Sequence, residues 1–166
     1  MNVLIILVIF AALLALAFAA FNYMTVEHME EGTETMKEIA AAIRVGANAF
    51  IAYEYKVLYT VVVIVAVILA LVTSWHAGVA LLIGSIMSGC AGLVGMKIAT
   101  LSNVRVSNKA RKSKDIGETV KVAFRGGSVM GLCVAGCALL GLFLVYVIFG
   151  IGMGQLSMLE AHTNAL

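Results

Sequence analysis

The sequence predicts an all-α integral membrane protein with four transmembrane helices, two of which carry long cytoplasmic extensions. Hydrophobic residues make up 63% of the 166 residues and charged residues only 12%, against about a quarter charged in a soluble domain. Four long apolar runs contain no charged residue and no histidine, and the chain has no proline to interrupt them. Together with a mean hydropathy of +1.07, these features exclude a soluble enzyme, a nucleic-acid-binding domain and a disordered chain.

The first helix is expected over residues 3–31. Its apolar run, residues 3–21, is long enough to cross roughly 28 Å of hydrocarbon. A cleaved signal peptide is the alternative, because Ala17-Phe18-Ala19 resembles a cleavage site. The leader contains no basic residue, however, and the run is longer than a usual signal core, which favours a retained span.

The second helix is expected over residues 33–74. Gly32 separates it from the first helix, and Thr35 with Glu38 fits a capping box at its start. Apolar residues recur at helical spacing from 36 to 50 and lead without proline into a second apolar run at 57–72. A helix of roughly 58 Å exceeds the bilayer thickness, so about half of it should project into the cytoplasm.

The third helix is expected over residues 78–104 and the fourth over residues 115–150. The third contains the apolar run 79–96, with Trp75 before it as an interfacial anchor. The fourth begins outside the membrane and enters it with the run 128–150. Residues 151–166 would then form an extracytoplasmic tail.

Small residues recur every four positions in the third and fourth helices. Such spacing lets helix backbones approach closely in lipid, where hydrophobicity does not drive helix association. A glycine-rich phosphate cradle is the alternative, but these glycines lie inside apolar helices and follow no strand. The predicted helix-packing residues are Gly84, Ser88, Gly92, Gly95, Gly127 and Gly131.

The distribution of basic residues predicts the orientation. From Lys97 to Arg125 there are eight basic residues and only two acidic ones, which makes this connection cytoplasmic by the positive-inside rule. The connection between the first two helices must then also be cytoplasmic. Both termini and the short turn after residue 72 are expected outside the cytoplasm.

Few residues suggest chemistry. Four glutamates at helical spacing after the first span (Glu27, Glu30, Glu31 and Glu34) could hold a divalent cation, but no second ligand cluster completes the shell. A solvated acidic helix end is therefore favoured. Cys133 and Cys137 lie one turn apart, but two thiols do not make a zinc site and packing is favoured.

The basic connection has two interpretations. Its residues could attract an anionic lipid or an anionic substrate, although fixing the topology is a sufficient role. The residues concerned are Arg105, Lys109, Arg111, Lys112 and Lys114. A charge at mid-membrane marks an ion pathway in many transporters, and none of the four apolar runs carries one. The sequence thus predicts no catalytic, substrate-binding or metal site in this segment.

Three stretches of the sequence, taken together, point to a known family. They run from Gly32-Thr33 to Glu54-Tyr55-Lys56, from Gly84 to Asn103-Val104-Arg105, and from Ala123-Phe124-Arg125-Gly126-Gly127 to Val129-Met130-Gly131. In this order and at this spacing, they resemble the N-terminal quarter of the membrane-integral, ion-pumping inorganic pyrophosphatases. Tyr53 departs from the basic residue often found before Glu54 in that family.

The resemblance implies a homodimeric pump, built from two rings of helices, that hydrolyses pyrophosphate with magnesium and drives protons or sodium outward. Potassium is a further cofactor in part of the family. The first four helices belong to the outer, supporting ring, and the family's acidic motifs begin about where Leu166 stands. This segment alone is therefore expected to be inactive and to bind no cofactor, its partners being lipid and the pump's remaining helices. The alternative is a stand-alone four-helix membrane protein with a structural or assembly role.

Overall fold

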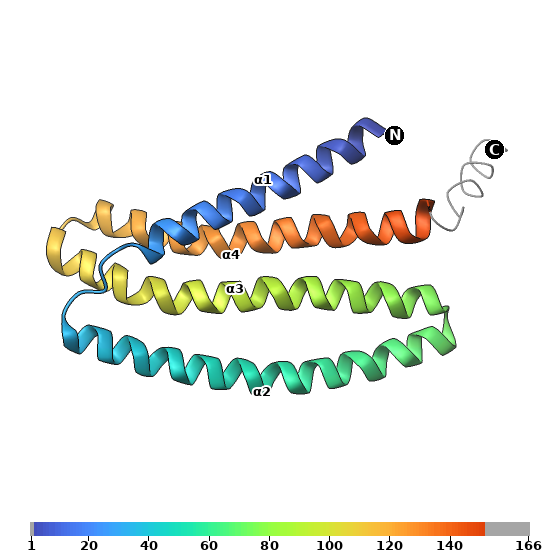
Figure 1. The fold of residues 1–166 in the computed structure, drawn as a ribbon, viewed down its shortest axis with the longest axis horizontal. Coiled ribbons are helices and arrows are strands. Elements are labelled where there is room, and N and C mark those ends of the chain that lie inside the picture. Colours follow the sequence, from blue (N-terminus) through green and yellow to red (C-terminus); the bar gives the residue numbers. More distant parts are fainter. Residues whose placement is uncertain (1, 152–166) are drawn as a thin grey trace.

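The computed structural model describes residues 2–151 as four long helices followed by a short π-helix (Figure 1). The elements are α1 (Asn2–Glu27), α2 (Glu34–Val72), α3 (Trp75–Ser113), α4 (Ile116–Val145) and the π-helix η1 (Tyr146–Ile151). All four α-helices are long and apolar enough to cross a membrane, which confirms the predicted fold class. Of the predicted tail 151–166, all but Ile151 lies outside the described residues.

The helices lie side by side in the order α2, α3, α4, α1 (Figure 1). The largest interfaces join α3 to α4, α1 to α4 and α2 to α3, and α1 crosses α4 at an angle. Both the α1–α2 and the α3–α4 connections lie at one end of the row, and the α2–α3 turn lies at the other (Figure 1). Because α2 buries only Ala40 and Ala66, most of its apolar surface remains available to lipid or to further helices.

The start of α2 differs from the predicted capping box. Gly32 adopts a φ of +102°, a conformation that favours glycine, and so breaks the chain after α1 as expected. Thr33 follows in an extended conformation, and its side chain accepts a hydrogen bond from the Met36 N–H at 3.4 Å. The cap is thus Thr33, and the prediction that Thr35 and Glu38 form the capping box was wrong, because helix has already begun at Glu34.

The third helix is longer than the predicted 78–104. It begins after Ser74, whose side chain accepts from the Ala77 N–H, and it continues to Ser113. The segment after 104 is rich in lysine and arginine, which are good helix formers, and contains neither glycine nor proline to end it. The helix ends where Lys114 adopts a left-handed conformation, after which Asp115 caps α4 by accepting from the Gly117 N–H at 2.8 Å.

The core is narrow and made largely of small side chains. It contains Ala19 and Val26 from α1, Ala91 and Ile98 from α3, and Val129 and Cys133 from α4. The small side chains let the backbones approach, so that dispersion contacts can hold the helices together.

One polar contact joins α1 to α4 beside this core. The buried Asn22 amide donates a hydrogen bond of 3.0 Å to the Ser128 hydroxyl, which itself donates to the carbonyl oxygen of Arg125. The interaction lies at the boundary where the apolar run of each helix ends. It therefore fixes how far α1 and α4 slide along each other.

Close packing near the α2–α3 turn should make Gly78 intolerant of a side chain. In Gly78→Ala, the new Cβ would lie 2.6 Å from the Ala66 carbonyl oxygen, a backbone atom that cannot rotate away. We expect a loss of about 1–3 kcal/mol in the free energy of unfolding, measured as a lower melting temperature in detergent. Gly84→Ala on the same helix is the control, since no atom lies within 4 Å of its Cβ. Equal melting temperatures for the two variants would contradict this packing.

Candidate functional site

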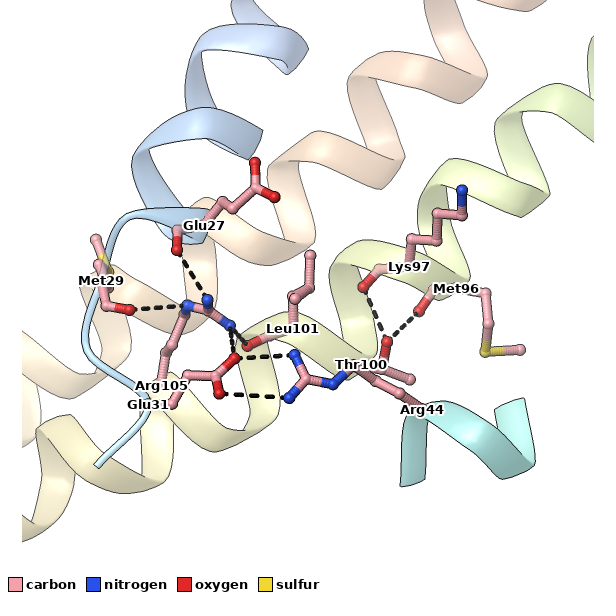
Figure 2. Close-up of polar contacts among 9 residues, drawn as sticks. All are labelled: Glu27, Met29, Glu31, Arg44, Met96, Lys97, Thr100, Leu101 and Arg105. Carbon is pink, nitrogen blue, oxygen red and sulfur yellow. Dashed lines mark hydrogen bonds and ion pairs between the residues drawn. The ribbon is translucent and has the colours of Figure 1, made fainter. Parts of the chain in front are cut away.

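Arg105 of α3 lies at the centre of the polar contacts between the helices. Its side chain is only 5% exposed, and its guanidinium donates hydrogen bonds to the carbonyl oxygens of Glu27 at 2.8 Å, Met29 at 3.1 Å and Leu101 at 2.8 Å (Figure 2). Glu27 ends α1, and Met29 lies in the connection to α2. One side chain from α3 therefore satisfies carbonyl groups that the end of α1 leaves without helical partners.

Glu31 connects this guanidinium to α2. Its carboxylate accepts hydrogen bonds from both terminal nitrogens of Arg44, at 2.9 and 3.3 Å, and lies 3.3 Å from Arg105 (Figure 2). The hydrogen bonds from Arg44 hold the pKa of Glu31 below its usual range, so the carboxylate is ionised at neutral pH. Arg105, Glu31 and Arg44, here called the Arg105 cluster, thus fasten α1, α2 and α3 at one end of the row.

A second layer of contacts holds the same connection one turn further along α3. The buried Asn108 amide donates to the Glu30 carbonyl oxygen at 3.1 Å and accepts from Arg111 at 3.0 Å. Lys112 forms an ion pair with the Glu30 carboxylate, and this hydrogen bond holds the pKa of Glu30 below its usual range. Basic and amide side chains of α3 therefore bind both the backbone and the carboxylates of the α1–α2 connection.

The acidic residues predicted as a solvated helix end do not share one environment. Glu27 and Glu34 are exposed, but Glu31 is partly buried between two arginines, so the prediction was wrong for Glu31. Within residues 2–151, no group of three or more His, Cys, Asp or Glu side chains is placed to hold a metal ion. Cys133 lies in the hydrophobic core, which confirms its predicted packing role.

The structure divides the predicted packing residues into two groups. A Cβ added at Gly92 would lie 2.6 Å from the Tyr55 hydroxyl of α2, and one at Gly95 would lie 2.9 Å from Met130 of α4. The other four face away from these helix contacts: Ser88 is exposed, and no atom lies within 4 Å of a Cβ built at Gly84, Gly127 or Gly131. A packing role for those four stays a prediction that needs partners outside the row.

Other glycines, absent from that set, make close contacts. Gly136 would place a Cβ 2.7 Å from Leu16 of α1, and Gly126 lies against Ser102 of α3. Gly89 accepts a 2.9 Å hydrogen bond from the Tyr55 hydroxyl through its carbonyl oxygen. A single sequence shows which positions are small but does not show which helix each faces.

A sequence signal for Arg105 did exist. The buried residues Ala91, Gly95, Ile98, Ser102 and Arg105 follow one another at alternating spacings of four and three, which places them on one face of α3. The stripe begins with small residues in the apolar run and continues without interruption into the basic segment. The stripe, extended past residue 104, predicts that Arg105 points inward. That prediction is missed when 105–114 is treated as a connection between helices.

Comparison with known proteins identifies the family. The family model for inorganic H+ pyrophosphatase matches residues 13–165. This chain belongs to that family.

Pumps that use pyrophosphate are similar to this chain along most of its length. A K(+)-stimulated pyrophosphate-energized sodium pump from Thermotoga maritima is 54% identical over 154 residues, which cover 93% of the chain and 21% of the relative. A K(+)-insensitive pyrophosphate-energized proton pump from Methanosarcina mazei is 38% identical over 142 residues, or 84% of the chain and 21% of the relative. The chain thus spans about a fifth of the length of the curated relatives it matches.

These matches and the four spanning helices make this chain an integral, multi-pass membrane segment. The residues of the Arg105 cluster all lie within the matched region. The hydrogen bonds and ion pairs of the Arg105 cluster join the helices at this end of the row. The arrangement can position α1, α2 and α3 relative to one another.

Removing the Arg105 guanidinium should destabilise this end of the bundle. In Arg105→Met, the carbonyl groups of Glu27 and Met29 lose a donor and Glu31 loses one of its two cations. We expect a loss of about 3 kcal/mol or more in the free energy of unfolding, with a smaller loss for Arg105→Lys, because one ammonium cannot reproduce the guanidinium fork. The measurement is the melting temperature in detergent.

The matched control is Lys97→Met. Lys97 lies on the same helix, is exposed, points away from the cluster (Figure 2) and makes no ion pair among residues 2–151. A melting temperature lowered equally by Arg105→Met and Lys97→Met would show that the cluster does not hold the helices together.

Proposed function

We propose that this chain forms the N-terminal, structural part of a pyrophosphate-energised proton or sodium pump. In this proposal, diphosphate hydrolysis drives outward ion transport, and the catalytic core lies in residues beyond the four helices. The observation that carries the proposal is the 54% identity to the Thermotoga maritima sodium pump over nearly the whole chain but a fifth of that relative. Magnesium, and potassium in a potassium-stimulated pump, would act at that core, and the complete pump would be a homodimer.

The exposed apolar surface supports a scaffolding role. α2 presents large apolar side chains along its length, including Ile39, Phe50 and Ile64, and packs mainly on α3. Helices with such a surface need lipid or protein against it. The remaining helices of a pump would cover part of this surface, and lipid would cover the rest.

The lengths of α2 and α3 support the same role. Each contains 39 residues, or roughly 58 Å, about twice the hydrocarbon thickness. Their ends therefore project beyond the membrane, where the Arg105 cluster holds them in register. A projecting, fastened pair of helices is suited to supporting a water-exposed catalytic domain.

We infer that the end carrying the Arg105 cluster faces the cytoplasm. The eight basic residues from Lys97 to Arg125 support this orientation. The N-terminus of α1, the α2–α3 turn and the end of α4 would then lie on the opposite side. Pyrophosphate hydrolysis would occur on the side of the basic end.

A chimaera tests the structural role. The aligned segment of the Thermotoga maritima pump is replaced by this chain, and magnesium-dependent release of phosphate from pyrophosphate is measured in membranes. We expect activity in the chimaera, because 54% identity preserves most contacts to the remaining helices, and no activity from this chain alone. A chimaera with Arg105→Met should lose most of its activity together with its folded yield.

Two outcomes would overturn this assignment. Pyrophosphate hydrolysis by the chain alone would place the chemistry inside it. A chimaera that inserts and folds but lacks activity would instead favour a stand-alone membrane protein.

Fusions test the orientation. Alkaline phosphatase is active only outside the cytoplasm, so a fusion after Thr73, in the α2–α3 turn, should be active and one after Lys114 should be inactive. Green fluorescent protein fused at the same two positions should give the opposite pattern. The reverse result in both reporters would invert the proposed topology.

A further inference from the structure

A cleft of about 530 Å³ opens where the α1–α2 connection, α3 and α4 meet at the basic end of the row. Five cationic side chains and only two carboxylates line it, so it carries a formal excess of three positive charges. The cationic residues are Arg105, Lys109 and Lys112 from α3 and Lys121 and Arg125 from α4.

Two of these cations form none of the ion pairs that join the helices, although the charge of Lys121 contributes to the lowered pKa of Glu118. Arg105 binds carbonyl groups and Glu31, while Lys109 pairs with Glu118 and Lys112 pairs with Glu30. Among residues 2–151, by contrast, neither Lys121 nor Arg125 forms an ion pair through its side chain. Because they stand four residues apart on one helix, both can approach a single ligand in the cleft.

Their chemistry selects an anion with several oxygens. A guanidinium binds two phosphate oxygens through its fork, and an ammonium adds a point charge beside it. Lys112 stands across the cleft on α3 with an exposed partner, Glu30, and can turn toward the same anion. A phosphate group therefore matches the available donors.

The position of the cleft favours a phosphate carried by a lipid. Arg125 lies three residues before the apolar run of α4, and the apolar run of α1 ends at Phe21, seven residues before His28 of the cleft. Exposed apolar residues adjoin the lining residues. Met24 of α1 lies one turn before His28, which follows the end of that helix, and Phe124 precedes Arg125 on α4. A headgroup in the cleft would let acyl chains cover this surface, which a free phosphate cannot do.

We propose that this cleft binds the phosphate headgroup of an anionic phospholipid. The bound phosphate contacts Lys121 and Arg125 of α4 and draws in Lys112 of α3, so the lipid adds a further connection between the two helices. The proposal needs only a membrane-inserted chain and does not depend on pump activity.

The test compares charge variants of the complete protein in nanodiscs of equal phosphatidylglycerol and phosphatidylcholine. Native mass spectrometry measures the ratio of the two lipids retained. We expect Lys121→Gln with Arg125→Gln to lower this ratio about tenfold or more, the order expected for two cations beside a lipid phosphate. The control, Lys56→Gln with Lys97→Gln, removes the same charge at exposed positions outside the cleft and should leave the ratio unchanged.

A variant that is expected to increase lipid binding separates a binding effect from misfolding. Glu30→Gln releases Lys112 from its ion pair and should raise the retention of phosphatidylglycerol. Millimolar inorganic phosphate should compete with the lipid, since both present the same group to the same cations.

Equal losses in the two double variants, or no gain in Glu30→Gln, would overturn the proposal. Binding of inorganic phosphate through Lys121 and Arg125 without any preference for phosphatidylglycerol would assign the cleft to a free anion. That result would overturn the proposal of a lipid ligand.

Discussion

The buried guanidinium of Arg105 is the interaction on which the basic end of this bundle depends. A buried charge is costly unless its hydrogen-bonding groups are satisfied and an opposite charge lies near. Here three carbonyl oxygens and the Glu31 carboxylate meet both requirements. The α1–α2 connection has no regular structure of its own from 28 to 33, and Arg105 together with Asn108 supplies donors that its backbone would otherwise take from water.

The membrane-spanning part is stabilised differently. Its interfaces contain Ala19, Ala91 and Cys133, with glycines at the closest approaches, and a hydrogen bond from the Tyr55 hydroxyl to the Gly89 carbonyl oxygen joins α2 to α3 there. Lipid offers apolar side chains as good an environment as protein does, so contact area and close fit must hold these helices together. Dispersion therefore dominates within the membrane and charge-assisted hydrogen bonds dominate outside it, and α3 takes part in both.

Most of the fold could be predicted from the sequence, because a long apolar run without proline has few alternatives. The break at Gly32 was also readable, since positive φ favours glycine. The predicted helix boundaries were wrong where two local patterns compete. Thr33 and Thr35 are both acceptable N-caps for α2, and the basic segment after 104 can form either helix or a connection. Among the predicted packing residues, only Gly92 and Gly95 closely approach a neighbouring helix in the row. Gly84, Gly127 and Gly131 have the right size and spacing, but which face of a helix meets a neighbour is set by the arrangement of all the helices.

The order of helices in the row has a consequence for biogenesis. α1 and α2 are made before α3 and α4, yet they share no substantial interface: α1 packs on α4 and α2 packs on α3. The donors that hold their connection, Arg105 and Asn108, leave the ribosome some 70 to 80 residues after it. α1 and α2 must therefore insert into the bilayer as independent spans. They can pack into the bundle only after α3 and α4 have been inserted.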